Sequence, residues 1–186
     1  MGVTPPRLWI ISGPSAVGKG TVCARLRLDH PELYHSISCT TRPPRVGETN
    51  GVEYHFLTDE QFDELVAQDK LLEWAIVHGT HRYGTPRGPV EVAIGEGHHV
   101  ILEIDLQGAR QVKEHMPEAQ LVFLEPPSWE ELVHRLVGRG TESEEAQQRR
   151  LETARKELAS AGEADHLIVN DTVESTVQAL VSLLGL

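Results

Sequence analysis

The stretch GPSAVGK at residues 13–19 decides the fold, because it fits the pattern G-x-x-x-x-G-K and lies between a short apolar run and a segment with helical spacing. A loop of this kind binds phosphate: its glycines let backbone amides turn inward, the following helix adds a positive dipole, and its lysine bridges the outer phosphates. We therefore predict a nucleotide site. The plainer alternative is a glycine-rich turn with a surface lysine. The residues predicted to hold the nucleotide are Gly13, Pro14, Ser15, Ala16, Val17, Gly18, Lys19, Gly20 and Thr21.

Gly20 departs from the usual pattern, in which Ser or Thr follows the lysine and holds Mg²⁺. Thr21 is a candidate substitute, but a shift of one residue turns a helical side chain by about 100°. We therefore expect no direct protein ligand and a Mg²⁺ ion held by the nucleotide phosphates and water. Asp105, which ends the apolar run VILEID, is expected to support the ion; alternatively, it only caps the helix that begins near Gln107.

Apolar runs of strand length recur along the chain, and their continuous rather than alternating character predicts a parallel sheet covered on both faces. The runs lie at Leu8–Ser12, Ser36–Cys39, Val100–Asp105, Leu121–Leu124 and Leu167–Val169. A first helix is expected from Gly18 to about Leu28, and residues 172–186 predict an amphipathic closing helix. Capping boxes mark two further helix starts, at Thr58…Gln61 and Ser128…Glu131.

Two segments interrupt this alternation. Between Thr40 and Tyr83 a loop rich in Pro, Gly and Arg is followed by the strand EYHFL, a helix over residues 59–68 and the strand LLEWAIVHG, which predicts a small inserted lobe. Residues 134–158 are dense in charge and helical on both sides of residues 138–141, which predicts a second insertion.

Composition restricts the partners of the protein. The chain has 186 residues, with 17 Lys and Arg against 28 Asp and Glu, and a formal net charge of -11. This length predicts one domain, and the negative charge argues against nucleic acid as a partner. Cys23 and Cys39 show neither metal-ligand spacing nor a disulfide framework, so we expect a reducing, cytoplasmic setting. The sequence shows no signal peptide and no run long enough to span a membrane.

The loop TTRPPRVGETNG at residues 40–51 predicts a second phosphate site. Arg42 and Arg45 are three residues apart in a proline-stiffened loop, where planar guanidinium groups can grip a phosphate bidentately at little entropic cost. Tyr54 and Tyr83 flank the lobe and can donate hydroxyls to the same phosphate. Each arginine alone is more simply a solvated loop charge. The pair, in one chain with the phosphate loop, favours substrate binding.

Seven segments, in their order and spacing, resemble the guanylate kinases of the P-loop nucleoside monophosphate kinase family over nearly the whole chain. They are ISGPSAVGKGT, SISCTTRPPRVGETNGVEYHF, LLEWAIVHG, YGTP, ILEIDLQGA, RLVGRGTE and IVND. The pattern TTRxPRxGExxGxxY is specific to that family, whereas many nucleotide-binding proteins share the phosphate loop alone. The resemblance implies transfer of the γ-phosphate of ATP to GMP or dGMP, giving ADP and GDP, with Mg²⁺, as part of purine nucleotide recycling.

The resemblance also implies the architecture. The expected fold is α/β: a three-layer P-loop kinase core with a five-stranded parallel sheet, an inserted small α+β GMP-binding lobe and a helical lid. The core would comprise residues 1–37, 86–127 and 156–186, the lobe residues 38–85 and the lid residues 128–155 of one guanylate kinase domain. We expect a monomer or a weak homo-oligomer.

Individual roles follow from the same resemblance. The GMP phosphate would be bound by Arg42, Arg45, Tyr54 and Tyr83, and the base or its surroundings by Ser38, Glu73 and Thr85. Catalysis would involve Lys19, Arg45, Asp105 and the lid residues Arg135, Arg139 and Arg150; Asp105 would also contact substrate, and Asn170 would lie near the adenine of ATP. Without the family, the segment RRLETARKEL reads as an ordinary exposed helix with salt bridges.

Glu73 is the residue we expect to select the base. Guanine presents two adjacent donors, N1–H and the exocyclic amino group, which one carboxylate can accept together, while Ser and Thr hydroxyls can donate to O6. Adenine lacks the N1–H, and a site built on such pairs can reject the wrong base by about 10⁴ to 10⁵. The alternative is a glutamate on the solvent side of an alternating strand.

Several positions depart from the family pattern. Ala16 replaces a frequent glycine, and Glu103 occupies the first acidic place of an Asp-Ile-Asp motif. The segment THR between Gly79 and Tyr83 is one residue longer than expected. Two rivals remain: a kinase for another nucleoside monophosphate, and a non-catalytic guanylate-kinase-like module that binds a phosphorylated peptide.

Overall fold

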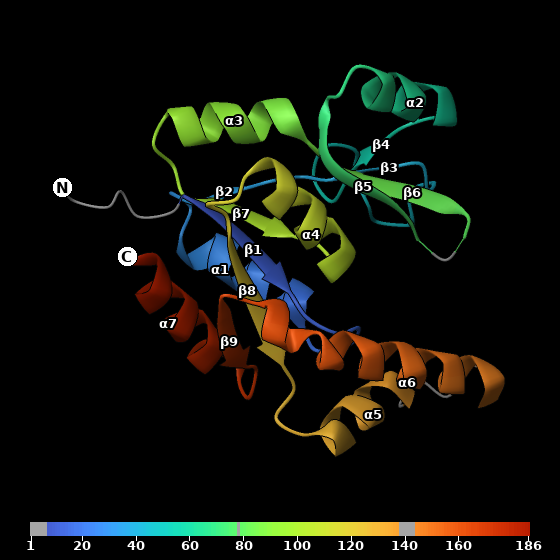
Figure 1. Ribbon diagram of the computed structural model, residues 1–186, viewed down its shortest axis with the longest axis vertical. Coiled ribbons are helices and arrows are strands. Elements are labelled where there is room, and N and C mark those ends of the chain that lie inside the picture. The colour runs from blue at the N-terminus through green and yellow to red at the C-terminus, as the bar shows by residue number, and fades with distance from the viewer. Residues whose placement is uncertain (1–6, 78, 138–143) are drawn as a thin grey trace. The chain divides into compact units, whose positions relative to one another are not determined.

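The computed structural model describes residues 7–77, 79–137 and 144–186 (Figure 1). Helices and strands alternate along most of the chain. In order they are β1 (Leu8–Ser12), α1 (Lys19–Asp29), β2 (Tyr34–His35), β3 (Cys39–Thr40), β4 (His55–Phe56), α2 (Asp59–Ala67), β5 (Leu71–Val77), β6 (His81–Pro86), α3 (Arg87–Gly95), β7 (Val100–Glu103), α4 (Leu106–His115), β8 (Gln120–Glu125), α5 (Trp129–Val137), α6 (Glu144–Ala159), the 3₁₀ helix η1 (Ala161–Glu163), β9 (His166–Val169) and α7 (Val173–Leu184).

The strands form two sheets. The larger has five strands in the order β2-β7-β1-β8-β9, and its pairs β2·β7, β1·β8 and β8·β9 are parallel. The smaller has the order β4-β3-β6-β5, with β3 antiparallel to β6 and β6 antiparallel to β5. The predicted α/β fold with a five-stranded parallel sheet is therefore confirmed.

The chain divides into two compact units, which we call unit 1 and unit 2. Within the described residues, unit 1 comprises Arg7 and Leu8 together with Glu32–Leu102 and Gln107–Ala119, and it contains the four-stranded sheet. In it, Phe62 of α2 packs with Cys39 of β3 and Leu71 of β5, so that α2 lies against that sheet (Figure 1). Unit 1 thus has a small core of its own.

Unit 2 comprises Trp9–Pro31, Glu103–Leu106 and Gln120–Leu186. Its helices α5 and α6 lie side by side (Figure 1), where Leu132 and Leu136 pack on Ala154. Strand β1, which leads into the phosphate loop, is fully buried, and the four central residues of its neighbour β8 are buried as well, as expected for strands covered on both faces.

The structure confirms most of the strand bounds, helix starts and capping boxes predicted from local sequence patterns. β1 has the predicted bounds, and α1 begins one residue after the predicted start. Both hydrogen bonds of the Thr58…Gln61 capping box are present, and Ser128 Oγ accepts from the Glu131 N–H at 3.1 Å. In the segment before Tyr83, Thr80 lies in a turn, whereas His81 and Arg82 belong to β6 and pair with Val77 and Ile76 of β5.

One predicted strand is wrong. Residues 36–39 do not form a single strand: β2 ends at His35 and pairs with β7, whereas β3 begins at Cys39 and pairs with β4 and β6. The chain passes from one sheet to the other over residues 36–38, and an apolar pattern cannot show where such a change occurs. The predicted run to Asp105 also ends earlier, at Glu103.

The described residues contain neither a membrane-spanning helix nor a group of side chains suited to a metal ion. None of the helices within residues 7–77, 79–137 and 144–186 is long and apolar enough to cross a membrane. Over the same part of the chain, no three His, Cys, Asp or Glu side chains are grouped so that they would hold a metal ion.

Candidate active site

The phosphate loop in unit 2 has the backbone that its sequence predicts. Gly13 and Gly18 have φ angles of 149° and 102°, and Ala16 has a φ of 65°, in the left-handed region. A Cβ atom on Gly13 would lie 2.6 Å from the carbonyl oxygen of Leu124, so the loop passes too close to β8 for any side chain. The two glycines are therefore required by conformation as well as by space.

Lys19 lies at the first position of α1, and its Nζ donates to the carbonyl oxygen of Gly13 at 2.5 Å. Burial lowers the pKa of Lys19, and the nearby carboxylates of Glu157, Glu103 and Asp105 oppose that shift. The loop thus holds its lysine folded back along its own backbone, with acidic groups around it.

Glu157 of α6 is also part of this environment, although nothing in the sequence indicated that it would contact the phosphate loop. Its Oε2 accepts a hydrogen bond of 3.1 Å from the backbone N–H of Ser15, in the middle of the phosphate loop. Burial raises the pKa of Glu157, while the Ser15 bond and the charge of Lys19 lower it. The residues are 142 positions apart, and the predicted exposed helix gave no sign that one of its glutamates reaches the loop.

Two further side chains hold the carbonyl oxygen of Val17. Asn170 is buried, and its Nδ2 donates to this oxygen at 2.7 Å while its Oδ1 accepts from Thr176 Oγ1 at 2.8 Å. Arg135 of α5 donates to the same oxygen from NH1 at 3.3 Å, and Glu131 holds its Nε at 2.9 Å. Asn170 and Arg135 therefore both hold the phosphate loop at Val17, and Arg135 connects the loop with α5.

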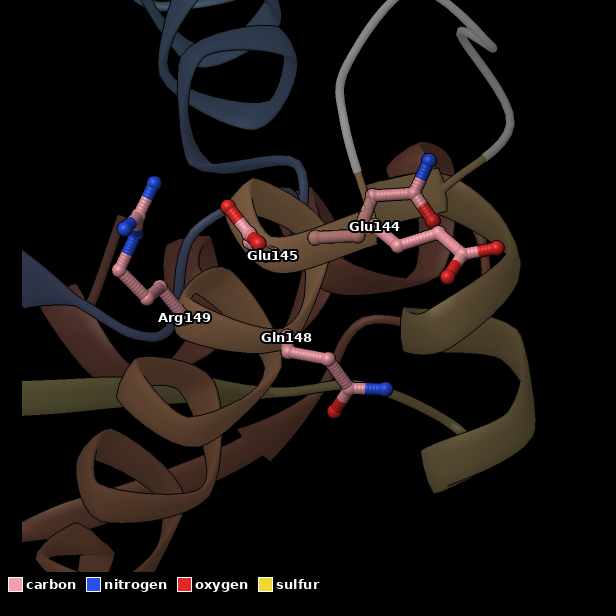
Figure 2. Close-up of a pocket in the computed structure, with 5 residues that line it drawn as sticks. Glu144, Glu145, Gln148 and Arg149 are labelled. Carbon is pink, nitrogen blue, oxygen red and sulfur yellow. The ribbon is translucent and has the colours of Figure 1, made fainter.

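Arg139 and Arg150 are the other two residues predicted for the lid. Arg150 is half-buried in α6. Arg139 lies outside the described residues. A pocket of about 650 Å³ lies at the beginning of α6 and is lined by Glu144, Glu145, Gln147, Gln148 and Arg149. Figure 2 shows the side chains that line it. None of these five side chains was predicted to bind substrate.

The residues considered for Mg²⁺ binding lie in or near the first turn of α1. Gly20 and Thr21 are exposed. A Cβ atom on Gly20 would lie 3.5 Å from Glu103 Oε1, so this carboxylate faces the place where a typical phosphate loop has its Ser or Thr. Asp105 is exposed and close enough to Lys19 to act on its pKa.

Unit 1 brings together the residues predicted to bind the acceptor phosphate. Arg42 Nε lies 3.2 Å from Tyr83 Oη, and the Arg42 guanidinium carbon lies 5.5 Å from the centre of the Tyr54 ring. The rings of Tyr54 and Tyr83 meet edge to face at 5.7 Å. Arg45 is exposed in the same loop.

Glu48 organises this loop, a role that its sequence did not reveal. Its two oxygens accept from NH1 and NH2 of Arg42, both at 2.9 Å, and Oε2 also accepts from the Arg45 backbone N–H at 2.7 Å. The hydrogen bonds from Arg42 and then from Arg45 lower the pKa of Glu48. Both ends of the Arg42 guanidinium group are bonded to Glu48, and bidentate binding of a phosphate by Arg42 stays a prediction.

Glu73 lies in β5 with only 6% of its surface exposed, so the alternative of a solvent-facing glutamate is wrong. Its Oε1 accepts a hydrogen bond of 2.6 Å from Oγ1 of Thr85, which is fully buried in β6. Ser38, the third predicted base contact, is half-buried just before β3. A buried carboxylate that keeps its charge needs partners of this kind, and a ligand with two N–H donors would supply more.

Comparisons with known proteins agree with this geometry. The family model for guanylate kinase matches residues 5–185. The chain is 60% identical to a guanylate kinase of Cutibacterium acnes over 182 residues, covering 98% of this chain and 92% of that protein. It is 59% identical to a guanylate kinase of Thermobifida fusca over 181 residues, covering 97% and 92%. A solved guanylate kinase from Anaplasma phagocytophilum, 30% identical, has a TM-score of 0.78 and covers 98% of this chain and 86% of its own. The chain therefore belongs to the guanylate kinase family.

Proposed function

We propose that this protein transfers the γ-phosphate of ATP to GMP or dGMP, giving ADP and GDP, with the donor bound in unit 2 and the acceptor in unit 1. An ATP:GMP phosphotransferase activity follows from membership of the guanylate kinase family. The observation that carries the assignment of the base is the buried carboxylate of Glu73, held by Thr85 in the same unit as Arg42 and Tyr83.

On the donor side, the backbone amides of residues 13–19 and the ammonium group of Lys19 bind the ATP phosphates. Asn170 and Arg135 hold the carbonyl oxygen of Val17 and so fix the loop on which these amides lie. Fixed donors of this kind neutralise charge on the transferring group without having to reorganise during the reaction. We assign Arg135, Arg139 and Arg150 to that neutralisation.

The kinases of this family use a divalent cation, and we propose Mg²⁺. The residues fit an ion held mainly through water, because Glu103 and Asp105 offer hard oxygen atoms near Lys19 while position 20 offers no side chain. When bound, the ion neutralises phosphate charge. Asp105, together with Glu103, would hold the water molecules around the Mg²⁺ ion.

On the acceptor side, Glu73 accepts the N1–H and the amino group of guanine. Thr85 has committed its hydroxyl hydrogen to Glu73, so it orients the carboxylate. We therefore assign the hydrogen bond to guanine O6 to Ser38. Arg45, Tyr54 and Tyr83 bind the GMP phosphate, together with Arg42 in the orientation set by Glu48.

The division of the chain into a core, a GMP-binding lobe at residues 38–85 and a lid at residues 128–155 belongs to the same proposal. Transfer needs the two phosphates in line with water excluded, and closure of lobe and lid on the bound substrates would provide both. We further propose a monomer or weak homo-oligomer that acts in the cytoplasm without nucleic acid.

The decisive experiment compares GMP, AMP, UMP and dTMP as acceptors in a coupled assay that follows ADP. GMP should be preferred, and Glu73→Gln should lose that preference while its KM for ATP stays the same. An amide at this position turns an N–H donor toward the donors of guanine, which removes the pairing that rejects adenine. Equal activity on AMP and GMP in the unmodified protein would contradict the assignment.

The phosphopeptide-binding module remains the alternative from another class. The phosphate loop and the contact of Arg135 with Val17 disfavour it, because a module that binds only peptide has no use for a braced ATP site. Isothermal titration of ATP in the presence of Mg²⁺ separates the two: no detectable binding would favour the module.

A further inference from the structure

The strand that carries Glu73 forms one edge of the four-stranded sheet, since β5 is the last strand in the order β4-β3-β6-β5. Along an edge strand, the backbone N–H and C=O groups of every second residue point away from the sheet and need other partners. In β5 these include groups of Leu72 and Trp74, which lie on either side of Glu73.

Helix α4 supplies partners for both backbone groups of Trp74 and for the carbonyl oxygen of Leu72. Gln111 Oε1 accepts from the backbone N–H of Trp74 at 3.1 Å, and Gln111 Nε2 donates to the carbonyl oxygen of the same residue at 3.0 Å. Four residues later, His115 Nδ1 lies 3.1 Å from the carbonyl oxygen of Leu72. Four residues rise about 6.0 Å along a helix and two residues about 6.6 Å along a strand, so the two spacings match.

The same face of α4 also limits the side chain of Glu73. Gly108 lies three residues before Gln111, so positions 108, 111 and 115 share one face of the helix. A Cβ atom on Gly108 would lie 2.7 Å from Glu73 Oε2 and 3.1 Å from its Cδ. The carboxylate is therefore enclosed between Thr85 on one oxygen and the backbone of Gly108 beside the other.

We propose that Gln111 is a positioning residue for base selection: by clamping both backbone groups of Trp74, it fixes the segment of β5 from which Glu73 reaches the base. The inference rests on the proposed function, in which Glu73 reads guanine. Two hydrogen bonds to one ligand edge tolerate little displacement, because each needs donor and acceptor about 2.7 to 3.2 Å apart. If β5 were held only by β6, the backbone around Glu73 could move and the carboxylate would not keep a fixed position.

The test variant is Gln111→Met, which keeps the length of the side chain and removes both hydrogen bonds. We expect the KM for GMP to rise by about tenfold to a hundredfold, with kcat changed less. The ratio of kcat/KM for GMP over AMP should fall, and the KM for ATP should stay the same. Glu114→Ala, an exposed change on the same helix, is the control and should alter none of these values.

A double-mutant cycle with Glu73→Gln separates positioning from general stability. If Gln111 acts through Glu73, Gln111→Met should change neither the GMP KM nor the selectivity further in the Glu73→Gln background. Equal effects in both backgrounds would overturn the inference and leave the role of Glu73 intact. If Glu73→Gln alone left base preference unchanged, the proposed reading of guanine would fail, and this inference with it.

Gln111→Glu keeps the proposal testable should Gln111→Met fail to fold. It keeps the size of the side chain and an acceptor for the backbone N–H of Trp74, and it replaces the donor to the Trp74 carbonyl oxygen by an acceptor. It should reproduce the rise in GMP KM and the loss of selectivity with an unchanged KM for ATP. A Gln111→Glu protein with the selectivity of the unmodified enzyme would show that the clamp on Trp74 does not set the carboxylate position, and would overturn the proposal.

Discussion

Replacing Glu157 by Gln is expected to tighten ATP binding. Glu157 Oε2 bonds the backbone N–H of Ser15, one of the amides assigned to the ATP phosphates. A phosphate oxygen that uses this N–H must therefore displace the carboxylate or lie beside it. Glu157→Gln keeps the size of the side chain and an acceptor oxygen, and it removes the negative charge that opposes the phosphate.

The geometry gives the size of the effect. The carboxylate oxygen lies 3.1 Å from the Ser15 nitrogen. A phosphate oxygen would bind at about 3 Å from the same nitrogen, so the two oxygens are at most about 6 Å apart. Two unit charges at that distance repel by about 0.7 kcal/mol in water and about 3 kcal/mol at an effective dielectric constant near 20. Since Glu157 is half-buried, we expect about 1 kcal/mol, or about fivefold tighter binding.

The assay is isothermal titration of Mg·ATP at about pH 8 and about pH 6 without GMP. Burial raises the pKa of Glu157, so the gap in ATP affinity between the unmodified protein and Glu157→Gln should narrow toward lower pH, and at a higher pH than for a carboxyl with an ordinary pKa. The titration of ATP itself is common to both proteins and cancels. Glu152→Gln is the control, because it removes the same charge from an exposed position of α6.

The raised pKa of Glu157 also predicts how the folding stability of the protein depends on pH. A carboxyl with a raised pKa in the folded protein contributes stability below its ordinary pKa, and this contribution is lost as the pH rises through the folded value. Glu157→Gln should therefore gain stability relative to the unmodified protein as the pH rises above about 4. Weaker ATP binding in Glu157→Gln, or equal tightening in Glu152→Gln, would refute the reasoning.

Two further predictions concern the other charged positions. Glu48→Gln should raise the KM for GMP by about tenfold, because Arg42 loses its bidentate partner, and should leave the KM for ATP unchanged in steady-state assays. Since the pKa of Glu48 is lowered, its contribution to stability is present above its ordinary pKa and lost as the pH falls through the folded value, so the difference in melting temperature between Glu48→Gln and the unmodified protein should shrink in acid. Gly20→Ser restores the usual metal-binding hydroxyl beside Glu103, and the Mg²⁺ concentration for half-maximal activity should fall several-fold. An unchanged Mg²⁺ requirement would show that the ion is not held at this position.

Features encoded by neighbouring residues were predictable from the sequence. The phosphate loop needs a strand, glycines and a helix start within about a dozen residues, and the Thr58…Gln61 capping box needs only four, so both follow from local chemistry. The break between β2 and β3 is different. It depends on which strand each short segment pairs with, and those partners lie elsewhere in the chain.

The side chains that organise the candidate site were harder to predict, for two reasons. Glu157 and Gln111 act on backbone groups of residues that are 142 and 37 positions away, and no periodicity marks a side chain that will bond a distant N–H. Glu48 lies only six residues from Arg42, but in a loop of this composition each charge alone reads as solvated. Only the fold shows that the two form a bidentate pair.

Removing the carboxylate charge of Glu48 and removing that of Glu157 should have opposite effects on substrate binding. Each residue places a carboxylate on a group that a substrate phosphate needs, the guanidinium of Arg42 in unit 1 and the N–H of Ser15 in unit 2. The Arg42 pair has two hydrogen bonds and little exposure, so separating it would leave a charge poorly solvated, and the pair should persist when GMP binds. The Glu157 contact is one hydrogen bond, which the Ser15 N–H donates to a half-buried carboxylate whose pKa is raised by burial, so ATP should displace this carboxylate more easily. Removing the first charge should therefore weaken substrate binding, whereas removing the second should strengthen it.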